Sequence, residues 1–133
     1  RVRESMSTHE YQLIRVNNED SVPVVTLLTT ELRSDTVIAK LEQEIEDFLQ
    51  KTGAKQVVFD LSPVHFMASC GLRVLIGLRK KLREVGGRFT MCGVHPYVAD
   101  VFKTTRLFTA KFDYLDDVAA AVAALKSPPS ETP

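Results

Sequence analysis

The apolar run from Gln56 to Leu61 constrains the fold more than any other stretch of this 133-residue chain. Its apolar residues follow one another without alternation, which is typical of a central strand covered on both faces. Amphipathic helical patterns flank it. The first begins at Ser34 or Asp35 and ends near Gly53, and the second begins around Ser69 and ends at a pair of glycines. Together they predict an α/β fold whose sheet is parallel in its middle.

The other expected elements are shorter. Strands over Tyr11 to Val16 and Val22 to Leu28 flank a polar stretch with turn chemistry, so we expect a hairpin. The later elements are a strand over Arg88 to Cys92, a short helix from Pro96, a strand over Phe108 to Phe112 and an Ala-rich helix over Leu115 to Leu125. The second amphipathic helix is expected to bury Leu72, Leu75, Ile76, Leu82 and Val85.

This order predicts a single domain with a small mixed sheet of about five strands and about four α-helices. We divide the chain into a flexible N-terminal segment over residues 1–10, a domain over residues 11–126 and a disordered, Pro-rich tail over residues 127–133. The short connections leave no room for a lid, which favours a binding module over an enzyme with a complex substrate.

Composition excludes several classes of function. The chain holds 17 Lys and Arg against 17 Asp and Glu, so no overall field attracts nucleic acid or an anionic membrane. It has no apolar run long enough to span a membrane and no signal peptide pattern, so we expect a cytoplasmic protein. Cys70 and Cys92 are expected to be free thiols, and no metal-ligand or nucleotide-binding spacing is present.

The passage from Phe66 to Leu72 leads from the loop after the central strand into the second helix. In an α/β sheet, ligands and modifications collect at such helix starts. Ser69 stands at the N-cap or beside it, where the helix dipole accommodates a phosphate of about −1.5 to −2 charge. The alternative is that Ser69 only caps the helix, contributing about 1 kcal/mol.

Cys70 allows two interpretations as well. At a helix N-terminus with Arg73 one turn later, its thiol is a candidate nucleophile or redox sensor. Alternatively, Cys70 replaces a small hydroxyl residue and packs under the loop.

Two stretches carry a resemblance to a known family. One runs from Val57 to Leu72 and includes Ala68-Ser69-Cys70-Gly71, and the other is Met91-Cys92-Gly93-Val94 followed by Pro96. With the helix between them, they resemble the STAS domain of anti-sigma factor antagonists, over roughly residues 11–125.

The resemblance implies a small mixed sheet with helices in a bacterial regulatory protein that is not an enzyme and holds no cofactor. It implies a partner that is both an anti-sigma factor and a serine kinase, and a serine phosphatase that reverses the modification. Phosphorylation of the matching serine, Ser69, releases the antagonist. The residues expected around the partner-binding surface are Arg33, Asp35, Ala68, Cys70, Gly71, Leu72 and Arg73.

The chain departs from the family pattern near this serine. The family writes Asp-Ser-Ser/Thr-Gly where Ala68-Ser69-Cys70-Gly71 stands, and Arg33 replaces the Asp of a Gly-x-Leu-Asp motif. If the fold brings Arg33 near Ser69, an acidic environment has become neutral or cationic. Then either phosphate on Ser69 is tolerated unusually well, or the kinase no longer recognises the site. Two further hypotheses are a non-switching, self-associating scaffold and a small thiol enzyme using Cys70.

Overall fold

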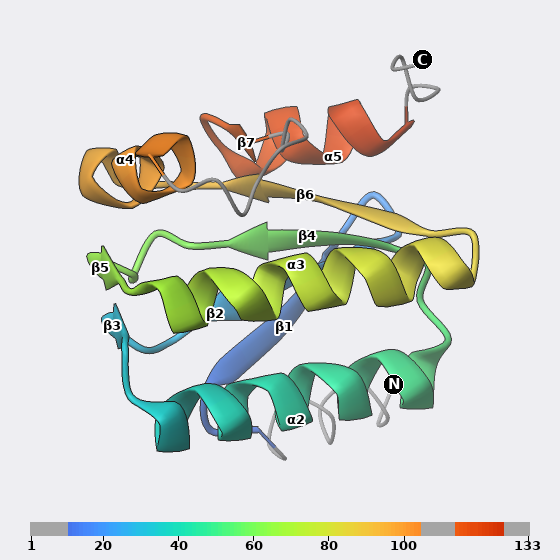
Figure 1. Ribbon diagram of the computed structural model, residues 1–133. Coiled ribbons are helices and arrows are strands. Elements are labelled where there is room, and N and C mark those ends of the chain that lie inside the picture. The colour runs from blue at the N-terminus through green and yellow to red at the C-terminus, as the bar shows by residue number, and fades with distance from the viewer. Residues whose placement is uncertain (1–10, 105–113, 127–133) are drawn as a thin grey trace.

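The computed structural model describes residues 11–104 and 114–126 (Figure 1). The first half of the chain contains β1 (Ile14–Glu19), β2 (Val22–Leu27), β3 (Glu31–Leu32), α2 (Asp35–Thr52), β4 (Gln56–Asp60) and β5 (Phe66–Met67). The second half contains α3 (Ser69–Glu84), β6 (Arg88–Cys92), α4 (Pro96–Thr104), β7 (Tyr114–Leu115) and α5 (Val118–Lys126).

Five strands form the main sheet in the order β1-β2-β4-β6-β7. β1 is antiparallel to β2, and every other neighbouring pair is parallel. β4 lies at the centre, and its residues Val57, Val58 and Phe59 are completely buried. The prediction of a mixed α/β domain that is parallel in its middle is confirmed. A separate two-stranded parallel sheet joins β3 to β5.

The helices cover the sheet on both faces (Figure 1). α2 and α3 lie on one face, where Phe59, Leu41 and Leu78 belong to the larger apolar cluster. α5 lies on the other face, where Val122 and Leu125 belong to a smaller cluster. Successive residues of β4 point to opposite faces, so Val58 belongs to the second cluster and Phe59 to the first.

α2 begins and ends at the capping residues that the sequence predicts. The Ser34 hydroxyl accepts a hydrogen bond from the Val37 N–H at 3.5 Å, as an N-cap does. Gly53 ends the helix with a φ of 66° and donates its N–H to the Leu49 carbonyl, as a left-handed C-cap does. β6 also occupies the predicted residues.

The hairpin differs from the prediction in its turn. β1 begins at Ile14 and continues through the polar residues to Glu19, so only Asp20 and Ser21 form the turn. Both have positive φ, 54° and 70°, as a tight two-residue hairpin turn requires. The polar residues fit in a strand because β1 is at the sheet edge and their side chains face solvent.

Two helix predictions also need correction. Val85 is exposed, not buried, because α3 ends at Glu84. The closing helix begins at Val118, not near Leu115, because Leu115 pairs with β6 and the Asp117 carboxylate accepts the Ala120 N–H at 2.9 Å.

The strand predicted over Phe108 to Phe112 and the terminal segments over residues 1–10 and 127–133 lie outside the described residues. None of the helices within residues 11–104 and 114–126 is long and apolar enough to cross a membrane.

Candidate functional site

The loop after β4 carries the chain to the start of α3. Asp60, at the end of β4, turns the chain by accepting hydrogen bonds from the Ser62 N–H at 3.0 Å and the Ser62 hydroxyl at 2.6 Å. The chain then pairs with β3 through β5, and the Ala68 N–H donates to the Leu32 carbonyl at 2.9 Å. These bonds hold the residue before the helix in place.

The N-cap of α3 is Ala68, and Ser69 is the first helical residue. Ala68 has the extended backbone of an N-cap, with φ −90° and ψ 172°, and it makes no side-chain capping bond. The alternative in which Ser69 serves to cap the helix is therefore wrong. Ser69 is exposed, and its hydroxyl forms no hydrogen bond with the part of the chain that the structure describes. This oxygen is accessible at the positive end of the helix dipole.

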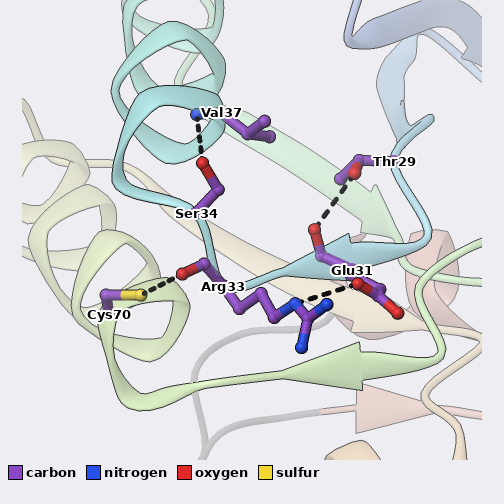
Figure 2. A network of polar contacts seen from close by, with 6 residues as sticks. All are labelled: Thr29, Glu31, Arg33, Ser34, Val37 and Cys70. Atoms are coloured by element: carbon purple, nitrogen blue, oxygen red, sulfur yellow. Dashed lines mark hydrogen bonds and ion pairs between the residues drawn. The ribbon is translucent and has the colours of Figure 1, made fainter.

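Cys70 is half-buried, and its sulfur lies 3.6 Å from the Arg33 carbonyl oxygen, toward which it points in Figure 2. A thiol is a weak donor, so this contact is a packing contact with a weak hydrogen bond. The position agrees with the interpretation that Cys70 packs under the loop. Across residues 11–104 and 114–126, no three His, Cys, Asp or Glu side chains are grouped so that they could hold a metal ion.

The backbone of Arg33 lies beside the start of α3, but its side chain turns away toward Glu31 (Figure 2). The same side chain also lies over the Phe66 ring. Its Nε lies 3.0 Å from a Glu31 carboxylate oxygen, and its Cζ lies 5.9 Å from the centre of the Phe66 ring. The parallel pairing of β3 with β5 places Glu31 opposite Phe66, so the two short strands build this group.

The other predicted site residues divide into exposed and buried ones. Asp35 and Arg73 are exposed, and Ala68 is half-buried. Gly71 and Leu72 are buried, so the Leu72 side chain faces the core and neither residue is itself exposed on the expected partner-binding surface. Gly71 has a packing role, because a Cβ there would lie 2.9 Å from the Leu32 Cβ.

Sequence reasoning missed two exposed aromatic residues near the start of α3. Phe66 on β5 is 44% exposed, and Tyr97 on α4 is 77% exposed. α4 packs beside β5, so both aromatic residues come from neighbouring elements. The signal in the sequence was their closeness to helix starts: Phe66 precedes α3 by three residues, and Tyr97 is the second residue of α4.

Two histidines also meet near this end of the sheet. The rings of His65 and His95 lie 4.3 Å apart between centroids, and His95 Nε2 lies 3.1 Å from the Ser62 carbonyl oxygen. His65 lies in the loop after β4, and His95 immediately precedes α4 and accepts the Ala99 N–H at its carbonyl. They join the loop after β4 to the loop after β6.

Comparison with known proteins agrees with this architecture. A protein of Bordetella bronchiseptica that is named as an anti-sigma factor antagonist, BtrV, is 35% identical over 88 residues, which cover 66% of this chain and 74% of the relative. A solved anti-sigma factor antagonist from Mycobacterium paratuberculosis is 28% identical, with a TM-score of 0.71 over 86% of this chain and 93% of that chain.

A structure from Thermotoga maritima, also named as an anti-sigma factor antagonist, shares the fold with a TM-score of 0.74. It is 20% identical and covers 90% of this chain and 99% of that one. The sequence model of the STAS domain matches residues 24–121, which include the central strand, the Ser69 helix and β6. The chain therefore belongs to the STAS domain family, and its relatives include proteins named as anti-sigma factor antagonists.

Proposed function

We propose that this protein is an anti-sigma factor antagonist that binds an anti-sigma factor with serine kinase activity and is released when Ser69 is phosphorylated. By occupying the kinase, the protein frees the sigma factor that the kinase otherwise holds. A serine phosphatase would restore binding. The protein itself carries out no chemical step, and it would act in the cytoplasm, where sigma factors work. The named relatives support the general function.

The exposed Ser69 hydroxyl is the observation that carries this proposal. A kinase has to reach the hydroxyl oxygen. If that hydroxyl capped the helix, its hydrogen bond to a backbone N–H would have to break first. Because Ala68 is the N-cap, the Ser69 oxygen is available without disrupting the helix. A phosphate there adds about −1.5 to −2 charge, which the N-terminal end of α3 accommodates but an apposed partner surface does not.

The exposed side chains around this serine form the proposed contact area, which we call the Ser69 surface. Its exposed members are Arg33, Asp35, Phe66, Ser69 and Arg73, with Ala68 and Cys70 half-buried beside them. Gly71 and Leu72 support it from below, where Gly71 allows α3 to approach β3 closely.

The test uses the whole protein and its Ser69→Ala and Ser69→Asp variants as baits in cytosol from the native source. We expect wild type and Ser69→Ala to retain a serine kinase, and Ser69→Asp to retain at least about tenfold less, since an added charge opposes docking. Adding ATP should release the kinase from wild type but not from Ser69→Ala. Peptide mass spectrometry should then find phosphate on Ser69 of the wild-type bait.

Ser21→Asp is the matched control. Ser21 is an exposed serine in the hairpin turn, and aspartate tolerates its left-handed backbone, so the variant adds one negative charge away from the Ser69 surface. It should bind like wild type. The proposal fails if both Ser69 variants hold the kinase equally, or if phosphate appears on another residue. An unmodified protein whose size-exclusion mass is a multiple of the monomer would support the scaffold hypothesis instead.

A further inference from the structure

The zero net charge of the chain conceals a separation of charge between two neighbouring helices. α3 carries five basic side chains and one acidic one, whereas α2 carries five acidic and two basic ones. The two helices pack together, and Lys81 of α3 is bonded to Glu46 of α2. Arg73, Lys80 and Arg83 remain exposed on α3, so the helix that begins at Ser69 presents a cationic outer face.

Arg33 and Arg73 supply the positive charges of the Ser69 surface, beside the exposed carboxylates of Glu31 and Asp35. The Arg33 guanidinium contacts Glu31 through Nε, and among the described residues no side chain engages its two terminal nitrogens. Those nitrogens form the fork that binds a carboxylate in a bidentate manner. The Arg33 guanidinium lies over the Phe66 ring, so this contact and the Glu31 ion pair both restrict the arginine side chain.

The ion pair with Glu31 does not prevent the Arg33 guanidinium from binding a carboxylate of a partner. The side chains of Arg33 and Glu31 are 62% and 50% exposed. An ion pair this exposed contributes about 0–1 kcal/mol to stability, because water solvates each charged group almost as favourably as the ion pair does. A partner carboxylate that also excludes water over Phe66 can therefore share or replace Glu31.

Two exposed aromatic residues, Phe66 under Arg33 and Tyr97 on the neighbouring α4, are of the kind found at interfaces. Phenylalanine is enriched in interface cores, and tyrosine and arginine are enriched among the residues that dominate binding energy. An aromatic floor with an arginine fork above it suits an acidic side chain next to an apolar one.

We infer that the Ser69 surface docks an acidic, amphipathic segment of its partner, and that Arg33, backed by Phe66, is the residue that selects it by binding a carboxylate. The inference rests on the proposed function for the location of the surface. It also gives the switch a physical reason: a phosphate on Ser69 repels an acidic partner segment directly.

The test needs no kinase. Wild-type protein labelled with ¹⁵N is titrated with a synthetic helical peptide that has glutamates on one face and leucines on the other, and with the same peptide carrying lysine for each glutamate. We expect the acidic peptide alone to shift the amide signals of residues 31–33 and 66–73. Its affinity should fall as ionic strength rises from about 0.05 to about 0.3 M, because salt screens exposed charges.

Two variants and one control isolate Arg33. Arg33→Glu should weaken binding of the acidic peptide at least about tenfold, and Glu31→Gln should strengthen it, because the fork loses its competing carboxylate. Arg15→Glu makes the same change of charge on the exposed edge strand β1 and should bind like wild type. Circular dichroism and thermal unfolding of each variant confirm that the fold is intact.

Three results overturn the inference: equal binding of both peptides, unchanged binding by Arg33→Glu, or signal shifts confined to the Lys80–Arg83 end of α3. None of them bears on whether a kinase phosphorylates Ser69. Conversely, an unmodified Ser69 in the kinase experiment leaves the peptide result standing, so the two proposals fail separately.

Discussion

At the scale of single residues, the position of the N-cap decides what Ser69 can do. The sequence offers Ser69 as a good capping residue, but the bond from the Ala68 N–H to the Leu32 carbonyl draws Ala68 into the extended conformation that an N-cap needs. Ser69 then becomes the first residue of the helix. A shift of one residue thus converts a structural hydroxyl into an accessible one.

The Cys92 thiol, in contrast to the exposed Ser69 hydroxyl, is buried. It lies at the carboxyl end of β6, buried against α5 and near Asp60. Burial disfavours the thiolate and the Asp60 carboxylate repels it, which together raise the pKa of Cys92 to about 12. The thiol is therefore a core group and not a nucleophile at neutral pH.

This raised pKa predicts an alkaline loss of stability. Because the folded state disfavours the thiolate, Cys92 contributes stability that is fully present below its ordinary pKa of 9.0 and is lost as pH rises toward 12. The loss is at most about 1.4 kcal/mol per pH unit. Urea unfolding from roughly one pH unit below the ordinary pKa of 9.0 to roughly two units above it should show a shallower decline in stability for Cys92→Ala than for wild type.

Val58→Ala is the control for that comparison, since Val58 lies in the same buried cluster and carries no ionisable group. It should lower stability at every pH while keeping the wild-type slope. A Cys92→Ala slope identical to that of wild type would show that the thiol does not titrate differently in the folded protein.

At the scale of elements, the two-stranded sheet of β3 and β5 determines where α3 begins. Each strand has two residues, and together they bring Arg33 close to the start of α3 (Figure 2) and place it over Phe66. α3 comes close to β3 only because Gly71 has no side chain: a Cβ there would meet the Leu32 Cβ at 2.9 Å and the Met67 Cγ at 3.1 Å.

We therefore predict opposite effects for two glycines of one helix. Gly71→Ala should destabilise the protein by about 1–3 kcal/mol, because its methyl group forces β3 and α3 apart. Gly77→Ala should stabilise it by about 0.5–1 kcal/mol, because a Cβ there meets nothing within 4 Å and alanine is the better helix former. Urea unfolding measures both. Equal changes in the two variants would contradict the close approach at Gly71.

At the scale of the whole molecule, one sheet is shared by two apolar clusters. The larger lies under α2 and α3 and the smaller under α5, and β2, β4 and β6 contribute residues to both. Because successive residues of each strand point to opposite faces, loosening either cluster disturbs strands on which the other depends. The domain is therefore expected to unfold as one unit.

Leu78→Ala and Leu125→Ala test this coupling, since each removes a nearly fully buried leucine from one cluster. Each should cost about 2–5 kcal/mol. Both should shift a single urea transition detected identically by circular dichroism and by tyrosine fluorescence. The control is Leu28→Ala, an exposed leucine, which should change the midpoint little. A second transition in Leu125→Ala would show that α5 unfolds independently.

The elements with strong local patterns could be predicted from the sequence alone. The buried strand β4, the amphipathic helices α2 and α3 with their glycine ends, and β6 were all predicted because hydrophobic period and capping chemistry are local properties. The family followed from the residues between Val57 and Val94, and the comparison with known proteins confirmed it.

The composition of the Ser69 surface depends on contacts between segments that are distant in the sequence. β3 and β5 are too short to show a period, so their pairing, and with it the group formed by Glu31, Arg33 and Phe66, exists only when distant segments meet. The same contacts hold Ala68 at the N-cap, expose Ser69 and bury Leu72. Local sequence cannot specify these positions, because they depend on hydrogen bonds between segments more than thirty residues apart.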